Sequence, residues 1–252
     1  MVSTARSRAE YEFLRWISPG EPRVCTGAAY AGKSKLAVLL GPDFLDRMRG
    51  KTVIDFGCGV GTEAIELAQH GARRVIGIDI REEALWKARE RARLAGVADQ
   101  CEFGTATDTA ADMIMSLDSF EHFEDVAGIL KVMDRLLSPE GEVVASFGPT
   151  WYHPLGGHLF SIFPWAHLIF SEASLIRWRS RFKDDGATCF RNTKGGLNQM
   201  TIRRFERIVA GSPFRFAEMA TVPIRKLQCV HNRWTREFTT ALVRCRLVKR
   251  SR

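Results

Sequence analysis

The sequence predicts an α/β fold: a Rossmann-like, mostly parallel sheet of seven strands with helices on both faces, and a helical cap inserted after the fifth strand. Two observations predict it. Short apolar runs alternate with longer amphipathic runs from residue 52 to residue 147. In addition, hydrophobic residues make up 45% and charged residues 26% of the 252 residues. That balance is typical of a globular chain and excludes a disordered, collagen-like or coiled-coil protein.

The expected elements follow from these patterns in chain order. The first 50 residues predict a helical lid, with an amphipathic helix at 9–17 that ends before Pro19 and a short apolar run at 35–40. The strands that we expect next are residues 52–56, 74–80, 100–103, 112–117 and 142–147, with helices at 63–70, 82–94 and 126–137 between them. This β-α-β order implies a parallel sheet.

The end of the chain is expected to complete the sheet. Thr201 is placed to cap a helix at 202–210, which Gly211 closes. Residues 214–222 and 238–248 have the β-rich composition of two further strands.

The segment between the fifth strand and this last helix is too long for a simple connection. It is dense in large apolar side chains, so we expect a mostly helical cap over the carboxyl edge of the sheet, where open α/β folds bind ligands. The expected organisation is a lid at 1–50, a core at 51–148, a cap at 149–200 and the completion of the sheet at 201–252.

The net charge of +8 is distributed unevenly. Residues 171–252 hold 19 Lys and Arg against 6 Asp and Glu and so carry +13, while the remainder carries −5. A basic segment of this kind is typical of contact with nucleic acid, an anionic membrane surface or an acidic substrate, and equally of a solvated surface.

The six cysteines form no C-x-x-C pair, which argues against a zinc site or a disulfide framework. No apolar run is long enough to span a membrane, and the first residues lack the apolar core of a signal peptide. The expected location is therefore the cytoplasm.

The most informative segment is the loop after the first strand, VIDFGCGVGT at 53–62. Glycines at alternate positions between a strand and a helix allow a tight turn and a close approach of a ligand to the backbone. Asp79 ends the second strand, 22 positions after Gly57, where an acidic residue commonly binds ribose hydroxyls. A dinucleotide fingerprint starting at Gly57 would need a glycine in place of Thr62, so the spacing disfavours a dehydrogenase.

The pattern D-x-G-x-G-x-G, followed by VIGIDI and SLDSFEHFED, resembles class I S-adenosylmethionine-dependent methyltransferases, in particular type 11 and ubiquinone-pathway-like enzymes. The resemblance covers roughly residues 50–149. It implies S-adenosylmethionine as the cofactor, with the three glycines along its methionine part, Asp79 on the ribose, and residues after the third strand beside the adenine. The acidic residue usual at the adenine is not clearly placed, and Asp108 is a candidate for it. The cofactor residues assigned in this way are Asp55, Gly57, Gly59, Gly61, Asp79, Ile80, Thr105, Ala106, Leu117 and Asp118.

Residues 27–34 match G-x-x-x-x-G-K-S, the phosphate loop of nucleotide hydrolases. That motif needs an apolar strand directly before it, whereas the preceding residues include Pro22 and two charges. We therefore favour a lid in which Tyr30 and Lys33 lie near the cofactor, or alternatively a surface loop.

Methyl transfer to a hydroxyl benefits from a base. His122, which follows the fourth strand, is the first candidate for a catalytic residue, and His153 is a weaker one. Asp118, Glu121 and His122 form D-x-x-E-H, which resembles a cluster associated with a divalent ion in some quinone-pathway O-methyltransferases. A packed histidine with solvated acids is the favoured interpretation of this cluster, so no metal site is assigned.

The cap begins with an aromatic segment. Trp151, Tyr152, His158 and Trp165 are expected to wall a pocket for a flat or lipophilic acceptor. The segment could equally form the core of the cap, or contact a membrane interface beside the basic C-terminal third.

The expected function is transfer of a methyl group from S-adenosylmethionine to a small organic acceptor, aromatic or lipophilic. Two alternatives stay open. RNA methylation is supported only by the basic charge, and a non-catalytic partner subunit would bind the cofactor without turnover. The sequence indicates neither the acceptor nor the oligomeric state.

Overall fold

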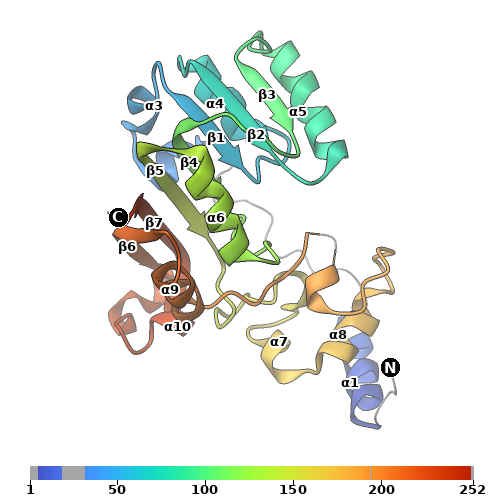
Figure 1. Cartoon of the computed structure of the whole chain (residues 1–252). Coiled ribbons are helices and arrows are strands. Elements are labelled where there is room, and N and C mark those ends of the chain that lie inside the picture. Colours follow the sequence, from blue (N-terminus) through green and yellow to red (C-terminus); the bar gives the residue numbers. More distant parts are fainter. Residues whose placement is uncertain (1–4, 19–31, 194, 251–252) are drawn as a thin grey trace.

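The structure, a computed structural model, describes residues 5–18, 32–193 and 195–250. Seven strands form one sheet in the order β3-β2-β1-β4-β5-β7-β6 (Figure 1). Strands β1 to β5 are parallel, and β7 lies antiparallel between β5 and β6. The fold class that the sequence predicts is therefore confirmed.

The bounds of the elements lie close to the expected ones. The strands are β1 Thr52–Phe56, β2 Arg74–Ile78, β3 Cys101–Gly104, β4 Ala111–Leu117, β5 Leu137–Phe147, β6 Phe214–Pro223 and β7 Thr240–Lys249. The helices of the sheet region are α2 Lys35–Leu40, α3 Phe44–Arg47, α4 Thr62–Gln69, α5 Glu82–Leu94, α6 Val126–Leu136, α9 Ile202–Ala210 and α10 Arg236–Thr239.

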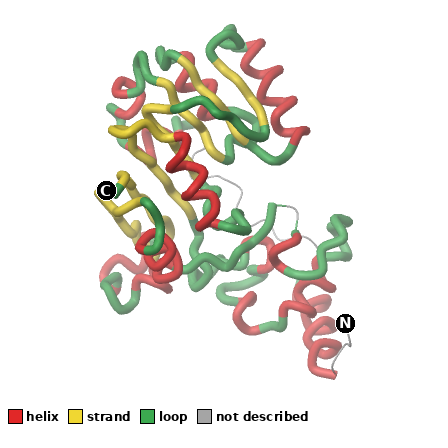
Figure 2. The backbone as a smooth tube through the Cα atoms, viewed as in Figure 1, coloured by secondary structure: helices red, strands yellow, loops and turns green. Residues whose placement is uncertain are grey.

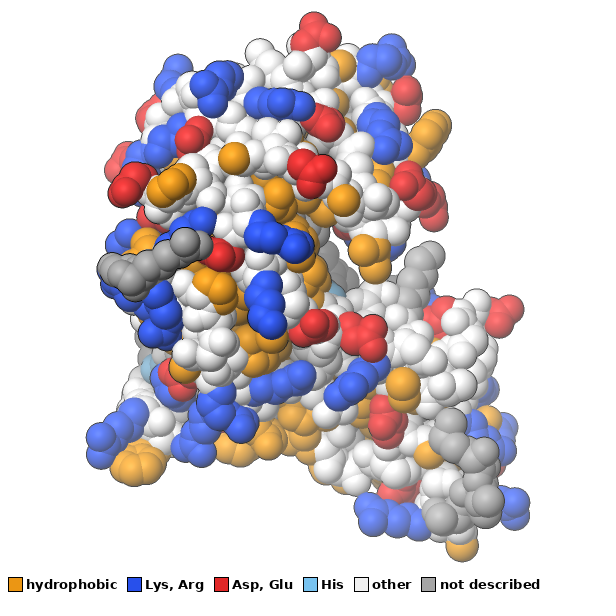
Figure 3. All heavy atoms as spheres, viewed as in Figure 1, with side chains coloured by type: hydrophobic (Ala, Val, Ile, Leu, Met, Phe, Trp, Pro, Cys, Tyr) orange, Lys and Arg blue, Asp and Glu red, His pale blue; other side chains and the backbone are white. Residues whose placement is uncertain are grey.

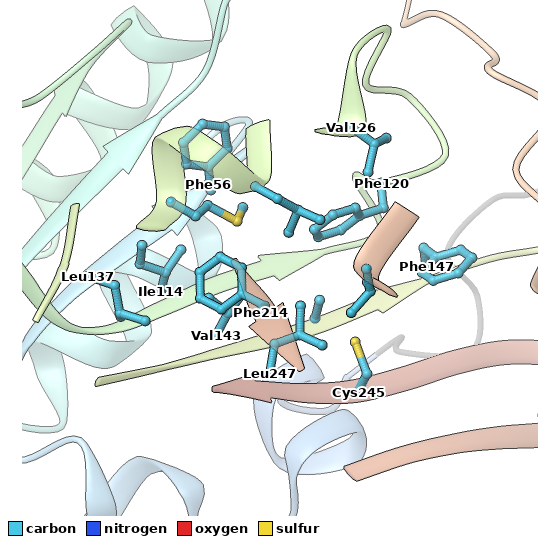
Figure 4. Close-up of a cluster of buried hydrophobic side chains, with 14 of the residues drawn as sticks. Phe56, Ile114, Phe120, Val126, Leu137, Val143, Phe147, Phe214, Cys245 and Leu247 are labelled. Atoms are coloured by element: carbon cyan, nitrogen blue, oxygen red, sulfur yellow. The ribbon is translucent and has the colours of Figure 1, made fainter. Parts of the chain in front are cut away.

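Apolar side chains on both faces of the strands fix the three-layer arrangement. All five residues of β1 are buried, as expected for a central parallel strand. One face packs against α6 and α9 through a core that includes Ile114, Phe120 and Phe147 (Figure 4). The other face packs against α2, α3, α4 and α5, with Phe44 and Leu67 fully buried there.

Three strand boundaries differ from the prediction by two residues or more: β2 ends at Ile78 and not at residue 80, and β5 and β7 begin at other residues. Strand β5 begins at Leu137, because Leu137 pairs with Ala111 before an irregular register leads to the pair of Glu142 with Met113. The sequence Ser-Pro-Glu-Gly at 138–141 has turn composition, which hid this part of the strand. Strand β7 begins only at Thr240, because the two preceding residues end α10.

The cap is less helical than the sequence predicts. Between β5 and α9 it contains α7 Ala166–Ile169, α8 Glu172–Arg179 and two 3-10 turns, and irregular segments join them (Figure 2). Glycine and proline are frequent in these segments and favour turns over continuous helix. None of the described helices combines the length and the apolar character needed to cross a bilayer.

The first helix, α1 Ala5–Ile17, lies beside α8 in the cap, far from its neighbours in sequence (Figure 1). Leu14 of α1 joins the core of the cap with Trp178 and Phe190. The indole Nε1–H of Trp178 donates a hydrogen bond to the carbonyl of Ser18 (2.8 Å). The N-terminal helix is thus packed as part of the cap.

Glu10 holds α1 on α8. Its carboxylate accepts hydrogen bonds from the amide of Ser171 (3.0 Å) and from the hydroxyls of Ser171 and Ser174, and it pairs with Arg6 (2.8 Å). Burial raises the pKa of Glu10, but the hydrogen bonds from Ser171, Arg6 and Ser174 outweigh it and lower the pKa to about 2.

We expect Glu10→Gln to lower the free energy of unfolding at neutral pH by about 1–2 kcal/mol, allowing for solvent screening at the helix edge. The folded pKa lies below the unfolded one, so this stabilisation is present above pH 4.5 and is lost as the pH falls toward 2. Urea unfolding of the wild type and the variant across this range measures it. Glu12→Gln on the same helix, where the carboxylate is half exposed and pairs with Arg15 among the described residues, is the control and should have little effect. A pH-independent difference between the wild type and Glu10→Gln would contradict the role of the Glu10 charge.

Candidate functional site

The glycine loop connects β1 to α4 at the carboxyl edge of the sheet. The amides of Gly57 and Cys58 donate to the carbonyl of Ile78 (2.8 and 3.0 Å), which ties the loop to the end of β2. Gly57, Gly59 and Gly61 all have positive φ (88°, 54° and 73°), a conformation that other residues rarely adopt. The chain therefore turns sharply at each alternate residue.

The three glycines differ in what surrounds them. A Cβ on Gly57 would lie 2.9 Å from Cβ of Ser119, and one on Gly61 would lie 2.8 Å from the ring of Phe103. At Gly59 the nearest atom is Nη2 of Arg81, 3.5 Å away. Gly57 and Gly61 are thus needed for packing, and Gly59 is the glycine that leaves open space for a ligand.

Asp79 lies in direct hydrogen-bond contact with Gly59, beside this space. Its buried carboxylate accepts hydrogen bonds from the amides of Gly59 and Arg81 (both 2.9 Å) and from the Arg81 guanidinium (3.0 Å). Burial raises the pKa of Asp79, but the hydrogen bonds and charge of Arg81, with the Gly59 amide, hold it below its ordinary value. The carboxylate therefore stays ionised at neutral pH, as an acceptor of hydroxyl groups must.

Residues beside Asp79 leave an apolar surface at the same edge. Ile80 is 89% exposed and presents its aliphatic side chain at this edge of the sheet. Thr105, Ala106 and Asp108 follow β3 and are exposed as well. The structure thus keeps Ile80, Thr105 and Ala106 accessible, as an adenine site requires.

Lys35 is a site residue that the sequence analysis missed. Its ammonium group pairs with Asp118 (2.9 Å) after β4 and lies 3.7 Å from Glu63 of α4. Burial lowers the pKa of Lys35, but the charges of Asp118 and Glu63 raise it above its ordinary value. The sequence pointed to Lys33, which is exposed, and Tyr30 lies outside the described residues.

Asp55 lies below the loop near the end of β1. Burial and the charge of Glu63 raise its pKa well above the ordinary value, although Lys35 opposes them. Its Oδ2 has no hydrogen-bond partner in the described structure. An unsatisfied buried carboxyl of this kind is costly unless a ligand or water completes it.

The turn after β4 lies between the glycine loop and the cap. Ser119 packs against Gly57, and the amide of His122 donates to the carbonyl of Ser119 (2.9 Å). On the other side, Nδ1–H of His122 donates to the carbonyl of Gly196 in the cap (2.8 Å). A neutral His122 anchored in this way carries its free lone pair on Nε2.

His158 of the cap lies beside His122, with ring centroids 5.4 Å apart. Its Nδ1–H donates to the carbonyl of Gly156 (3.2 Å), so its Nε2 is also unprotonated. Burial, with a smaller effect of His122, lowers the pKa of His158 to about 4. The sequence placed His158 in the wall of a pocket and as a further candidate for the base, and its contact with His122 depends on the folding of the cap.

Glu121 completes a polar cluster with these two histidines. One potential ligand atom from each of Glu121, His122 and His158 lies within 4.8 Å of the others, a spacing that could hold a metal ion. Burial, with the charge of Asp118 adding to it, raises the pKa of Glu121 to about 8, and its Oε2 has no partner in the described structure. The alternative set from the sequence, with Asp118 in place of His158, is not brought together, because Asp118 pairs with Lys35.

The remaining predicted residues lie farther into the cap. Nδ1 of His153 accepts a hydrogen bond from the amide of Leu155 (2.9 Å), which leaves the proton of the neutral ring on Nε2 and no free lone pair for a base. Trp151 packs against His167 and Phe190 in the core of the cap.

Tyr152 and Trp165 lie on the surface of the cap, each more than a third exposed. Contact of Trp151, Tyr152 and Trp165 with an acceptor stays a prediction.

Comparison with known proteins identifies the core. The model of a family described as "Methyltransferase domain" matches residues 48–152. These residues form a class I S-adenosylmethionine-dependent methyltransferase domain. The matched segment contains the glycine loop, Asp79 and the turn with His122.

Curated relatives of the methyltransferase domain include a ubiquinone biosynthesis O-methyltransferase from Neisseria meningitidis, 36% identical over 114 residues (41% of this chain, 48% of the relative). A ribosomal protein L11 methyltransferase from Vibrio cholerae is 35% identical over 136 residues (48% of this chain, 46% of the relative). The chain spans about half or less of the length of these relatives. A solved structure, magnesium protoporphyrin IX methyltransferase from Synechocystis PCC 6803 with bound S-adenosylhomocysteine, has the same fold at 19% identity (TM-score 0.54, covering 99% of this chain and 98% of that one).

The residues of the methyltransferase domain fit its cofactor, S-adenosylmethionine. Open space at Gly59, an ionised Asp79 facing it and an exposed Ile80 provide room for a ribose, a hydrogen-bond acceptor for its hydroxyls and an apolar surface for a base. In this structure the Arg81 guanidinium donates hydrogen bonds to both carboxylate oxygens of Asp79. The hydroxyls of a bound ribose would replace the guanidinium at these oxygens.

We expect Asp79→Ala to weaken the binding of S-adenosylhomocysteine by roughly 1.5–3 kcal/mol, or about ten- to a hundredfold in Kd. Isothermal titration calorimetry measures this. Arg81→Ala is the matched control, because it removes the guanidinium and keeps the carboxylate, and it should bind at least as tightly as the wild type. Unchanged affinity in a folded Asp79→Ala variant would exclude the ribose contact.

Proposed function

We propose that the protein transfers the methyl group of S-adenosylmethionine to a hydroxyl of a small aromatic or lipophilic acceptor, with His122 as the general base. The observation that carries the proposal is the position of His122. It lies on the turn that touches the glycine loop through Ser119 and the cap through Gly196, and the hydrogen bond to Gly196 uses Nδ1 and leaves the lone pair on Nε2.

Methyl transfer is an in-line displacement, so alignment of donor and acceptor accounts for much of its acceleration. When bound, S-adenosylmethionine supplies a methyl group on a positively charged sulfur, and the electron pair of the broken bond returns to that sulfur. Nε2 of His122 accepts the proton that the acceptor hydroxyl loses as its oxygen bonds to carbon. Gly196 holds the imidazole in the required tautomer.

Neutral neighbours favour this role for His122. His158 stays uncharged at neutral pH, because burial lowers its pKa to about 4. Burial raises the pKa of Glu121 to about 8, which favours its uncharged form at neutral pH. Glu121 beside His122 is buried, and His122 and His158 are half-buried, which favours a lipophilic acceptor over a charged one.

Turnover with a panel of phenols, catechols and quinols, followed as formation of S-adenosylhomocysteine, tests the proposal. We expect methylation of at least one phenolic compound, with the methyl group on oxygen. The relatives are named as O-methyltransferases of ubiquinone biosynthesis and as methyltransferases of ribosomal protein L11, so ribosomal protein and RNA are included as acceptors. Methylation of RNA or protein alone, or cofactor binding with no turnover on any acceptor, would contradict the proposal. The second result would favour a partner subunit.

A further inference from the structure

A band of exposed apolar side chains runs along one edge of the molecule. We call it the apolar band, and Figure 3 shows hydrophobic side chains interspersed with basic ones along the lower edge of the view. Its members are Phe13 and Trp16 of α1, Tyr152, Trp165, Leu168 and Ile169 of the cap, and Val230, Trp234 and Phe238 of the segment between β6 and β7.

Contacts make the band continuous. The ring of Phe13 lies 6.1 Å from that of Phe170, which directly follows α7. Nε1–H of Trp165 donates to the carbonyl of Tyr152 (2.9 Å), and the ring of Tyr152 lies 5.2 Å from that of Phe238. Three parts of the chain that are distant in sequence thus contribute to one surface (Figure 1).

Basic residues accompany the band at its C-terminal part. Arg225, Lys226 and Arg233 are exposed, and the guanidinium of Arg233 lies 4.5 Å over the ring of Trp234. Glu237 does not offset them at the surface, because it is buried and accepts hydrogen bonds from the first two amides of α9. The segment therefore presents positive charge next to aromatic rings.

We propose that the apolar band docks the protein on the surface of a lipid bilayer that contains anionic lipids. Tryptophan and tyrosine are suited to the boundary between headgroups and acyl chains, because each combines an apolar ring with a polar group. Lysine and arginine beside them are attracted to anionic headgroups. Trp234 is 71% exposed and projects from the surface, which suits insertion into a bilayer better than the lining of a peptide groove.

Docking on this edge would bring the cap to the bilayer. The cap also supplies His158 and Gly196 to the cluster around His122. A lipophilic acceptor could then pass from the bilayer to the site without crossing water, and this step alone rests on the proposed function.

Co-sedimentation with vesicles of phosphatidylcholine, with and without phosphatidylglycerol, tests the surface without cofactor or acceptor, so its outcome is independent of methyl transfer. We expect salt-sensitive binding to the anionic vesicles. Trp234→Ser combined with Phe238→Ser should weaken it, and Arg225→Glu combined with Lys226→Glu should weaken it at least about tenfold.

Trp86→Ser and Lys87→Glu on α5 are the matched controls. Trp86 is 61% exposed and Lys87 is also exposed, and α5 lies at the far end of the molecule from the band (Figure 1). Both variants should bind like the wild type. No binding to anionic vesicles, or equal binding by all variants, would overturn the inference. So would a wild-type dimer that Trp234→Ser converts to a monomer, because the band would then join two copies of the chain.

Discussion

His122→Asn is expected to lower turnover by about 10²–10⁴-fold, the contribution of a positioned general base. Asparagine retains an N–H that can donate to the carbonyl of Gly196, so the anchor to the cap is kept while the basic nitrogen is lost. Affinity for S-adenosylhomocysteine should not change, because the contact with the glycine loop is made by Ser119. Single-turnover kinetics and calorimetry on the same variant separate these two effects.

Acceptors of different acidity test whether His122 acts as a base. The loss in His122→Asn should shrink for a phenol acidic enough to be ionised at the assay pH, because such an acceptor has no proton to lose. His153→Asn is the comparison, since its side-chain oxygen can still accept from the amide of Leu155 and turnover should be unchanged. An equal loss for ionised and un-ionised acceptors would indicate that His122 only positions the cap.

The sheet could be predicted because its signals are local. The burial of β1 and the turn at Gly57 to Gly61 follow from a short apolar run and a glycine pattern within ten residues. Asp79 could be placed because parallel strands bring their carboxyl ends to one edge. The helix at 202–210 was predicted to the residue, because Thr201 accepts a hydrogen bond from the amide of Arg204 and so marks its start.

The rest of the site depends on contacts between distant segments. The pair of Lys35 with Asp118 and the packing of His158 on His122 join residues that no periodicity links. Composition alone cannot tell a pocket wall from a core: Trp151 is predicted in a pocket wall and packs against the core of the cap, and its contact with an acceptor stays a prediction. The role of Glu10 could not be predicted, because Ser171 and Ser174, which hold it in the cap, lie about 160 residues away in the sequence.

Gly59→Val is expected to abolish cofactor binding while the protein still folds. The branched side chain would enter the open space beside Gly59, where Nη2 of Arg81 is the only atom of the described residues within 4 Å of a Cβ. The backbone at Gly59 has φ of 54°, so any substitution there also costs about 1–2 kcal/mol of stability.

Gly96→Val is the control that separates the filling of the cofactor space from the cost of backbone strain. Gly96 has φ of 71° and open space around it, and it follows α5 away from the loop, so it has a comparable backbone cost and no role at the site. The two variants should lose a similar amount of stability in urea, and Gly96→Val alone should bind S-adenosylhomocysteine in calorimetry and show a rise in Tm when the ligand is added.

Binding by a folded Gly59→Val variant would contradict the cofactor site, because the ligand would have to lie elsewhere than against the glycine loop. Loss of binding in both variants would mean that strain, and not occupied space, decides the result.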